Sequence, residues 1–337
     1  MLKLGPVEIA KYPFVEDASS YIRDIGITLE KLGTDPDLQI FIDMAMKRIR
    51  TAADGGVYES LPDMLDKRRM MFETLSFLVA VILLKLCGMQ TLIRRFALAE
   101  ARRAEKNLGV DLRIHPADKF ELAKRLIGDL FSVNIEYING DLSVPVQDYL
   151  TRAINFHERE WNLVNRRVSK GRVYLTRHET VRLLRTEISS YIQAKIRSAK
   201  MPTMQSGFEK PVTELIDLAK RFASETVIVS GEHPPCIKHA IEILERGENL
   251  PHSGRFMLAT FLLNRGQSVE QIAPLFKNAP DYNERTTMYQ LRNLSGESGG
   301  GTKYTCPSCE KIKSNDMCFA NEKCDGIFTP LHFGRKK

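Results

Sequence analysis

The chain has 337 residues, of which 43% are hydrophobic and 27% charged, a composition typical of a folded globular protein and not of a disordered one. This length is sufficient for two domains, each with its own buried core. The formal net charge of +7 is consistent with a polyanionic partner such as nucleic acid, but charge alone does not identify that partner.

The sequence carries no clear membrane or secretion signal. Its longest apolar stretch, residues 77–84, is far shorter than the roughly 20 residues that a membrane span requires. The N-terminus lacks the basic start and the apolar stretch of a signal peptide. We therefore expect a cytoplasmic protein with no membrane partner.

Residues 19–108 have helical periodicity. Residues 71–86 are apolar nearly all round, which indicates a buried helix. The next helix is expected over residues 90–108 and to end at Gly109, because glycine is common just past the end of a helix. Its basic side is interpreted as a solvated helix face and consists of Arg94, Arg95, Arg102 and Arg103.

A small strand-containing unit follows among the helices. Residues 133–138 alternate between apolar and polar side chains, and Asn139-Gly140 is a strong hairpin turn before residues 142–144. Residues 164–168 and 172–175 predict a second hairpin. The unit therefore combines helices with two short hairpins.

Helix starts are marked further along the chain. Thr176 and Glu179 have the spacing of a capping box, which predicts that a helix begins there. Residues 212–222 are helical again after an irregular stretch. Pro234-Pro235 is expected to open another helix at Cys236, because proline fits a first turn that needs no backbone donor.

The predicted fold class is mainly α, in two domains. Residues 1–200 form a helical N-terminal domain with the small inserted α/β unit, and residues 201–211 are the predicted linker because their periodicity fades. Residues 212–337 form an all-α C-terminal domain that ends in an irregular, cysteine-rich tail.

Five of the six cysteines lie in the last third of the chain, whereas Cys87 lies in an apolar run and is interpreted as a core residue. In a reducing compartment such a group indicates metal ligation. One assignment is a zinc site within the tail, with ligands Cys306, Cys309, Cys318 and Cys324. The other is a [4Fe–4S] cluster in which Cys236 joins three tail cysteines. Spacing alone leaves both open and favours zinc slightly.

Four sequence blocks resemble, in the same order, signatures of the large subunit of archaeal and eukaryotic DNA primases. The blocks are His233-Pro-Pro-Cys236-Ile, His252-Ser-Gly-Arg255, Tyr289-Gln-Leu-Arg292-Asn-Leu-Ser-Gly296 and Tyr304-Thr-Cys-Pro-Ser-Cys309. N-terminal stretches agree more loosely, among them Trp161-Asn-Leu-Val-Asn165. The resemblance therefore covers nearly the whole chain.

The resemblance implies a C-terminal iron–sulfur domain with one [4Fe–4S] cluster, for which zinc is the alternative metal. The implied ligands are Cys236, Cys309, Cys318 and Cys324. Cys306 would be a fifth thiol beside the cluster. The chain departs from the family at Asn293 and Thr329, which stand where histidine is frequent.

The resemblance also implies a role, that of the regulatory, non-catalytic subunit of a heterodimeric primase that makes short RNA primers for DNA replication. The N-terminal domain would bind the small catalytic subunit. The C-terminal domain would bind single-stranded template, the RNA primer/DNA duplex and the 5′-triphosphate of the initiating NTP. No catalytic site is expected in this chain, which lacks a phosphate-binding Gly-x-x-x-x-Gly-Lys loop. The alternative function is a zinc-binding nucleic-acid adaptor that uses the cysteine tail.

The C-terminal blocks supply candidate nucleotide contacts. Arg255 can offer its guanidinium fork to phosphate oxygens, and Gly254 beside it would allow close backbone approach. The alternatives are a surface ion pair for Arg255 and a core position for Tyr289. The expected contacts with nucleotide or nucleic acid are His252, Arg255, Tyr289, Gln290 and Arg292.

Overall fold

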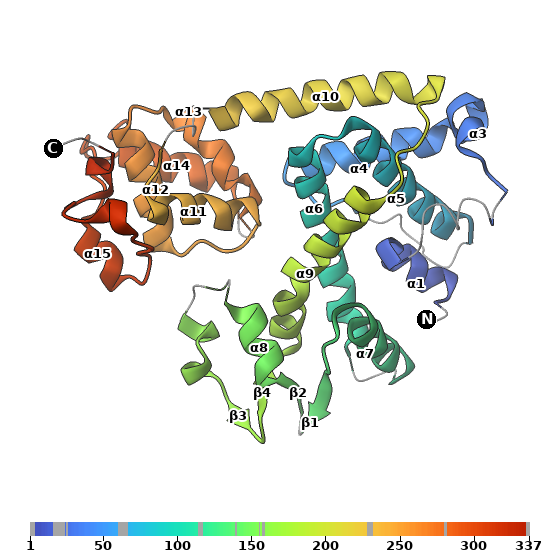
Figure 1. Ribbon diagram of the computed structural model, residues 1–337, viewed down its shortest axis with the longest axis horizontal. Helices are drawn as coiled ribbons and strands as arrows, with labels where there is room; N and C mark the ends of the chain where they lie inside the picture. Colours follow the sequence, from blue (N-terminus) through green and yellow to red (C-terminus); the bar gives the residue numbers. More distant parts are fainter. Residues whose placement is uncertain are drawn as a thin grey trace. The chain divides into compact units, whose positions relative to one another are not determined.

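A computed structural model describes residues 4–15, 24, 26–59, 67–113, 117–138, 140–154, 156, 159–227, 232–279 and 282–334. The chain divides into two compact units (Figure 1). The first unit contains residues 1–152 and 166–222, and the second contains residues 153–165 and 223–337.

Helices form most of the first unit, as the sequence predicted. They are α1 (Pro6–Lys11), α3 (Leu29–Thr34), α4 (Gln39–Ala53), α5 (Lys67–Cys87), α6 (Gln90–Asp111), α7 (Ala117–Phe131), α8 (Val146–Ala153), α9 (Arg177–Ser198) and α10 (Ser206–Val227). Single 3₁₀ turns occur at Pro13–Val15 and Pro36–Leu38. The longest of these helices, α5, α6, α9 and α10, have 21 or 22 residues each.

Helix α5 is the buried helix that the apolar stretch predicted. Within it, Arg68–Cys87 is long and apolar enough to cross a membrane by length and composition, so the apolar segment is longer than residues 77–84. However, 78% of that segment's most apolar window is buried inside the protein, a pattern that the core helix of a folded protein also gives. Glu73, within α5, is fully buried and ion-paired.

A buried charge network joins α4, α5 and α6. The guanidinium of Arg48 pairs with the carboxylate of Glu100 at 2.6 Å, and Arg103 pairs with Glu73 at 2.9 Å. All four side chains are less than 5% exposed. Because an unpaired buried charge is costly, these pairs fix how the three helices pack against one another.

The arginines of α6 correct one sequence prediction. Of the four that were interpreted as a solvated face, only Arg94 is exposed, and Arg103 belongs to the buried network. Arg95 and Arg102 donate hydrogen bonds to the backbone oxygens of Ala53 and Gly55. The prediction failed because the side of α6 that carries these arginines faces α4 and α5. Backbone carbonyls and carboxylates there accept hydrogen bonds from the arginine side chains.

Helix α6 also continues through Gly109 and ends at Asp111, two residues beyond the expected stop. Gly109 is not among the residues with positive φ, so it does not adopt the left-handed conformation that a glycine C-cap requires. A methyl group built at Gly109 would meet no atom within 4 Å.

The inserted unit contains one four-stranded antiparallel sheet in the order β1-β2-β4-β3. Its strands are β1 (Glu136–Ile138), β2 (Asp141–Pro145), β3 (Val168–Ser169) and β4 (Arg172–Leu175). Both predicted hairpins are present, although Asn139 of the first turn lies outside the described residues. The second hairpin is shorter than predicted, because residues before Val168 form the 3₁₀ turns Arg159–Trp161 and Leu163–Asn165.

The predicted capping box is confirmed at the start of α9. The Thr176 hydroxyl accepts from the Glu179 amide at 3.2 Å, and the Glu179 carboxylate accepts from the Thr176 amide at 2.8 Å. Two first-turn groups are thereby satisfied at once.

The predicted linker, residues 201–211, is irregular only up to residue 205, because α10 begins at Ser206. Gly207 lies against the first unit so closely that a methyl group there would come within 1.9 Å of the Gly33 carbonyl oxygen. Phe208, Val212, Leu215 and Ala219 form the buried face of α10 at helical spacing. This part of α10 therefore belongs to the first unit. The domain bounds 1–200 and 212–337 stay a prediction.

The second unit is all-α with a tail of little regular structure, as predicted. Its helices are α11 (Pro235–Glu245), α12 (His252–Asn264), α13 (Val269–Ile272), α14 (Glu284–Ser295) and α15 (Cys309–Ser314), with 3₁₀ turns at Ala273–Asn278, Glu322–Cys324 and Pro330–His332. The core includes Ile237, Leu258 and Phe261 from the helices. Ile312 and Met317 of the tail are buried in the same core, so the tail is part of the folded unit.

Candidate metal centre and nucleotide pocket

The first turn of α11 places Cys236. Pro234 is the N-cap and Pro235 the first helical residue, so the chain enters the helix without a backbone donor at either position. Cys236 follows directly and is only 9% exposed. The double proline thus fixes the thiol at the start of a helix that is packed into the core.

The tail places the other thiols. Ser308 caps α15 by accepting from the Lys311 amide at 3.2 Å, and Cys309 is the first residue of that helix. The Cys309 amide donates to the Phe328 carbonyl at 2.8 Å, which connects the two ends of the tail. The Cys324 thiol lies 3.6 Å from the side-chain oxygen of Asn321.

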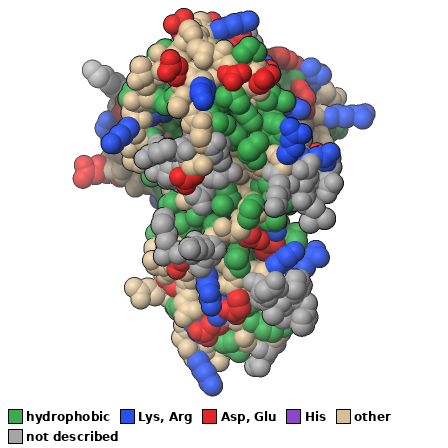
Figure 2. Space-filling model, turned by 90° about the vertical axis from the view of Figure 1, so that its right-hand side faces the viewer, with side chains coloured by type: hydrophobic (Ala, Val, Ile, Leu, Met, Phe, Trp, Pro, Cys, Tyr) green, Lys and Arg blue, Asp and Glu red, His purple; other side chains and the backbone are tan. Residues whose placement is uncertain are grey.

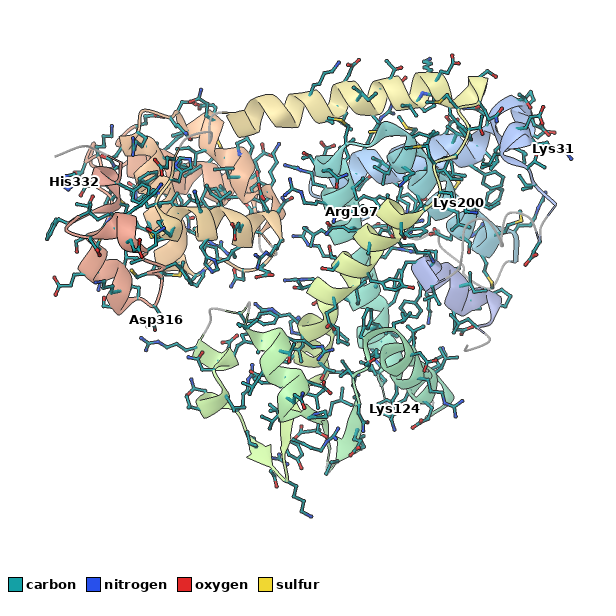
Figure 3. All side chains as sticks on the ribbon, in the orientation of Figure 1. Lys31, Lys124, Arg197, Lys200, Asp316 and His332 are labelled. Carbon is teal, nitrogen blue, oxygen red and sulfur yellow. The ribbon has the colours of Figure 1, made fainter. Side chains whose placement is uncertain are left out.

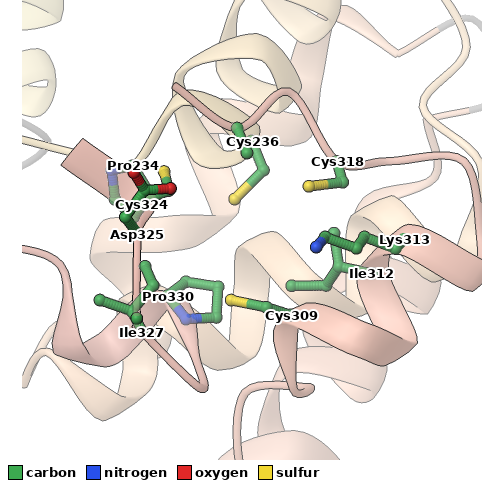
Figure 4. Close-up of a pocket in the computed structure, with 12 residues that line it drawn as sticks. Pro234, Cys236, Cys309, Ile312, Lys313, Cys318, Cys324, Asp325, Ile327 and Pro330 are labelled. Atoms are coloured by element: carbon green, nitrogen blue, oxygen red, sulfur yellow. The ribbon is translucent and has the colours of Figure 1, made fainter. Parts of the chain in front are cut away.

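Cys236, Cys309, Cys318 and Cys324 line one cavity of about 190 Å³. The side chains of Cys236, Cys309 and Cys318 point toward one another across it (Figure 4). The wall is otherwise mostly apolar, with Lys313 and Asp325 as its charged members; the apolar residues are Pro234, Ile312, Ala320, Ile327 and Pro330. The four thiols that the resemblance singled out are therefore brought together from α11 and from the tail.

Cys306 is placed differently from these four thiols. It is 7% exposed and does not line the cavity, and its thiol interacts with the Thr260 hydroxyl. Within the described ranges, no group of three or more His, Cys, Asp or Glu side chains has the arrangement of a ligand set for a metal ion. This holds for the four thiols that line the cavity as well as for a local zinc site of four tail cysteines.

Burial controls the protonation of these thiols. Burial and, to a smaller extent, the neighbouring sulfurs of Cys309, Cys318 and Cys324 raise the pKa of Cys236 to about 12. Burial also raises the pKa of Cys309, against the charge of Lys313. Thiolates in this cavity therefore need a cationic centre to stabilise them.

A second pocket of the same unit, of about 260 Å³, lies between α12 and α14. It is lined by His252, Arg255, Tyr289 and Gln290, four of the five predicted nucleotide contacts. The fifth, Arg292, does not line it; its guanidinium is half-exposed and lies 4.0 Å from the Glu270 carboxylate.

The environment of Arg255 limits what its side chain can do. Its Nε donates to the Leu250 carbonyl at 2.7 Å, and its Nη2 donates to the Asn249 side-chain oxygen at 2.5 Å. One edge of the guanidinium fork is therefore held by the protein, which orients the group at the pocket wall. Both of these partners are uncharged oxygen atoms, so neither contact is the surface ion pair that was the alternative for Arg255.

Tyr289 is 66% exposed, which rules out the core position. Gly254, by contrast, does not serve close approach to a ligand. A methyl group there would come within 2.7 Å of the Leu250 side chain and 2.8 Å of the Met317 side chain. The absence of a side chain at Gly254 lets α12 pack against the tail. The role that the sequence analysis gave to this glycine, close backbone approach to phosphate, was therefore wrong.

Sequence reasoning did not name three pocket residues as contacts, namely Phe256, Tyr282 and Tyr304; Asn293, noted only as standing in place of a frequent histidine, also lines the pocket. Tyr304 is 40% exposed and is held by two backbone bonds, from its amide to the Leu294 carbonyl at 3.0 Å and from the Asn264 side chain to its carbonyl at 3.1 Å. The sequence did mark Tyr304, because this residue begins the block that ends at Cys309. It was interpreted only as part of the cysteine signature.

Comparison with known proteins identifies the family of this chain. The family described as "Eukaryotic and archaeal DNA primase, large subunit N-terminal domain" matches residues 10–202, and the corresponding C-terminal domain family matches residues 227–331. The chain is 33% identical to the DNA primase large subunit PriL of Methanocella arvoryzae, over 99% of this chain and 89% of the relative. For the same subunit of Methanosarcina barkeri the identity is 31%, over 98% of this chain and 79% of the relative. The chain therefore belongs to the family of eukaryotic and archaeal DNA primase large subunits.

Proposed function

We propose that this chain is the regulatory, non-catalytic subunit of a cytoplasmic heterodimeric DNA primase. Relatives that are named as large subunits imply a small subunit that carries the catalytic site. The N-terminal domain would bind that subunit. The C-terminal domain would bind the single-stranded template, the RNA primer/DNA duplex and the 5′-triphosphate of the initiating nucleotide.

The thiol-lined cavity supports one [4Fe–4S] cluster, with Cys236, Cys309, Cys318 and Cys324 as ligands. A cavity of about 190 Å³ is more than ten times what one water molecule needs, which suits a polynuclear cluster better than a single ion. Its apolar wall would keep water from the sulfur atoms. The tail-only zinc site requires Cys306, whose thiol lies outside the cavity wall.

The bound cluster would supply the positive iron centres that buried thiolates require. Its position suggests a structural consequence for this chain. Cys236 is fixed to α11, whereas the other three ligands belong to the tail. The cluster would therefore fasten the tail, with Tyr304 at its beginning, to the helices that form the nucleotide pocket.

The pocket between α12 and α14 suits the initiating nucleotide. Arg255 and His252 provide hydrogen-bond donors for phosphate oxygens, since the guanidinium is already oriented by Leu250 and Asn249. Tyr289 and Tyr304 are exposed aromatic rings on which a base or sugar can stack. Gln290 can hydrogen-bond the nucleotide, and Arg292, outside the pocket, can reach a backbone phosphate.

The single observation that carries this proposal is the convergence of Cys236 with three tail thiols on one cavity. Protein purified without oxygen should contain four iron and four sulfide ions per chain, from the stoichiometry of one such cluster. Cys236→Ser should lose most of the iron, and the matched control Cys306→Ser should retain it. A colourless protein that holds one zinc ion would contradict the cluster, as would loss of metal from the Cys306 variant alone.

The role in initiation is tested separately, with the small subunit present. Arg255→Ala should impair synthesis from free nucleotides much more than extension of a preformed primer. Arg292→Ala is the matched control from outside the pocket and should weaken template binding without that difference. Equal loss in both assays for Arg255→Ala would contradict its contact with the 5′-triphosphate.

A further inference from the structure

The first unit has an open basic cavity of about 530 Å³, far along the sequence from the nucleotide pocket. It lies between the second half of α6 and the first turn of α9. Its basic lining residues are Arg102 and Lys106 of α6 with Arg177 and His178 of α9. Glu105, Gly109, Thr176 and Val181 complete the wall.

Positive charge is in excess in this cavity. The one lining carboxylate, Glu105, lies 3.5 Å from the guanidinium of Arg185, which is itself only 6% exposed. Lys106, Arg177 and His178 are exposed, and within the described ranges their side chains form no ion pair or hydrogen bond with other residues. The acidic charge is therefore already balanced, whereas the basic side chains at the rim are available to a ligand.

Arg102 adds a cation at the base of the cavity. Its guanidinium donates to the Gly55 carbonyl at 3.3 Å. Burial and the charge of Arg185 together lower the pKa of Arg102 to about 10, against the opposing charge of Glu105. Because Arg102 lies near the buried guanidinium of Arg185, an anion that approaches it would be stabilised by both positive charges.

The shape and chemistry of the wall indicate which anion fits. None of the lining residues is Phe, Tyr or Trp, and His178 is the one aromatic ring among them, so the lining is mainly cationic. Lysine and arginine side chains bind phosphate without regard to the base. The space next to Gly109 is open, since a methyl group built there would meet no atom within 4 Å.

We propose that this cavity is a second nucleic-acid contact, which binds the phosphodiester backbone of a single strand through Lys106, Arg177 and Arg102. The inference deepens the proposed function, because it names a template contact in the N-terminal part of the chain. Binding there is independent of base sequence and is weakened by salt, since each phosphate contact releases counterions.

Gly109 allows a sharp test that leaves the cations in place. Gly109→Glu adds a carboxylate to the wall, and Gly109→Gln adds the same shape without charge; neither meets an atom within 4 Å at its Cβ. Full-length protein is titrated with a fluorescent 20-nucleotide oligothymidylate, and binding is followed by anisotropy. If one contact is lost, affinity falls about eightfold at 0.05 M salt and about fourfold at 0.15 M, from a slope of roughly 0.7 per contact in single strands.

Lys106→Gln and Arg177→Gln should each lower the salt slope by roughly 0.7. Lys31→Gln on α3 (Figure 3) is the charge-matched control and should leave the slope unchanged. Equal affinities for the Gly109→Glu and Gly109→Gln proteins would overturn the proposal. The proposal would also be overturned if the Lys106 and Arg177 variants lost binding of free ATP and kept binding of the oligonucleotide. If the unmodified chain binds no single strand at all, the proposed function itself has failed.

Discussion

The contact between α12 and the cysteine tail depends on the absence of a side chain at Gly254. A methyl group at this position would lie 2.7 Å from the Leu250 Cδ1 atom and 2.8 Å from the Met317 Cε atom, both closer than carbon atoms pack. Met317 precedes the proposed ligand Cys318 and is only 2% exposed. Gly254→Ala should therefore press the tail away from α12 and disturb the thiol-lined cavity.

Two opposing effects set the size of the change. Overpacking a filled core costs about 1–3 kcal/mol. Alanine in place of a helical glycine returns about 1 kcal/mol of backbone preference. Because both clashing atoms are the ends of flexible side chains, we expect a net loss of about 1 kcal/mol in the free energy of unfolding. For a unit of this size, that loss lowers the melting temperature by about 3–5 °C.

A double-mutant cycle with Met317→Ala tests the origin of this loss. Met317→Ala alone should cost about 2–5 kcal/mol, because it leaves a cavity in the core. It also removes one of the two clashes, so Gly254→Ala made in that background should be neutral or stabilising. The measurement is urea unfolding followed by circular dichroism, with Gly109→Ala as the control for helix preference in open space. A Gly254→Ala effect that is the same in both backgrounds would refute the packing argument.

Three further predictions concern the first unit. Gly207→Ala should destabilise it by about 3 kcal/mol or more, because the new methyl group would meet the Gly33 carbonyl oxygen at 1.9 Å; an unchanged melting temperature would contradict this contact. Thr176→Ala should cost about 0.5–2 kcal/mol in urea unfolding by removing the capping box of α9, and Thr176→Ser should restore most of it. Burial opposes the charge of Glu100, but Arg48 and Arg103 outweigh it and lower the pKa of its carboxyl. Its contribution is therefore complete above the unfolded pKa of about 4.3 and is lost as the pH falls toward the lowered folded value. Glu100→Gln should cost about 3–5 kcal/mol at pH 7, and a similar loss at pH 3 would show that the charge is not what matters.

Hydrophobic side chains gather on one face of the protein, with Lys, Arg, Asp and Glu side chains around them (Figure 2). The apolar pattern along the chain could not predict such a surface. Periodicity reports which residues of a helix share a side, but it does not report which sides are covered by another element. The same limit explains the arginines of α6, since Arg103 has the spacing of an exposed residue and yet pairs with Glu73 in the core.

Local sequence determined much of this protein. The apolar run of α5, the capping box at Thr176, the hairpins of the sheet and the proline entry into α11 follow from interactions between residues close in the chain. The spacing of the tail cysteines also predicted a shared ligand group, although that group included Cys306 and left the metal open. These features could be predicted because backbone preferences and neighbouring side chains are enough to produce them.

Only the tertiary structure decided which distant groups meet. It placed Cys236 with the tail thiols and left Cys306 outside their cavity, a choice that spacing had left open. It also turned Gly254 toward Met317 and brought Tyr304 to the pocket between α12 and α14. The physical reason is that burial and contact across more than 50 residues of sequence depend on how helices pack, and packing is a property of the whole core and not of any one segment.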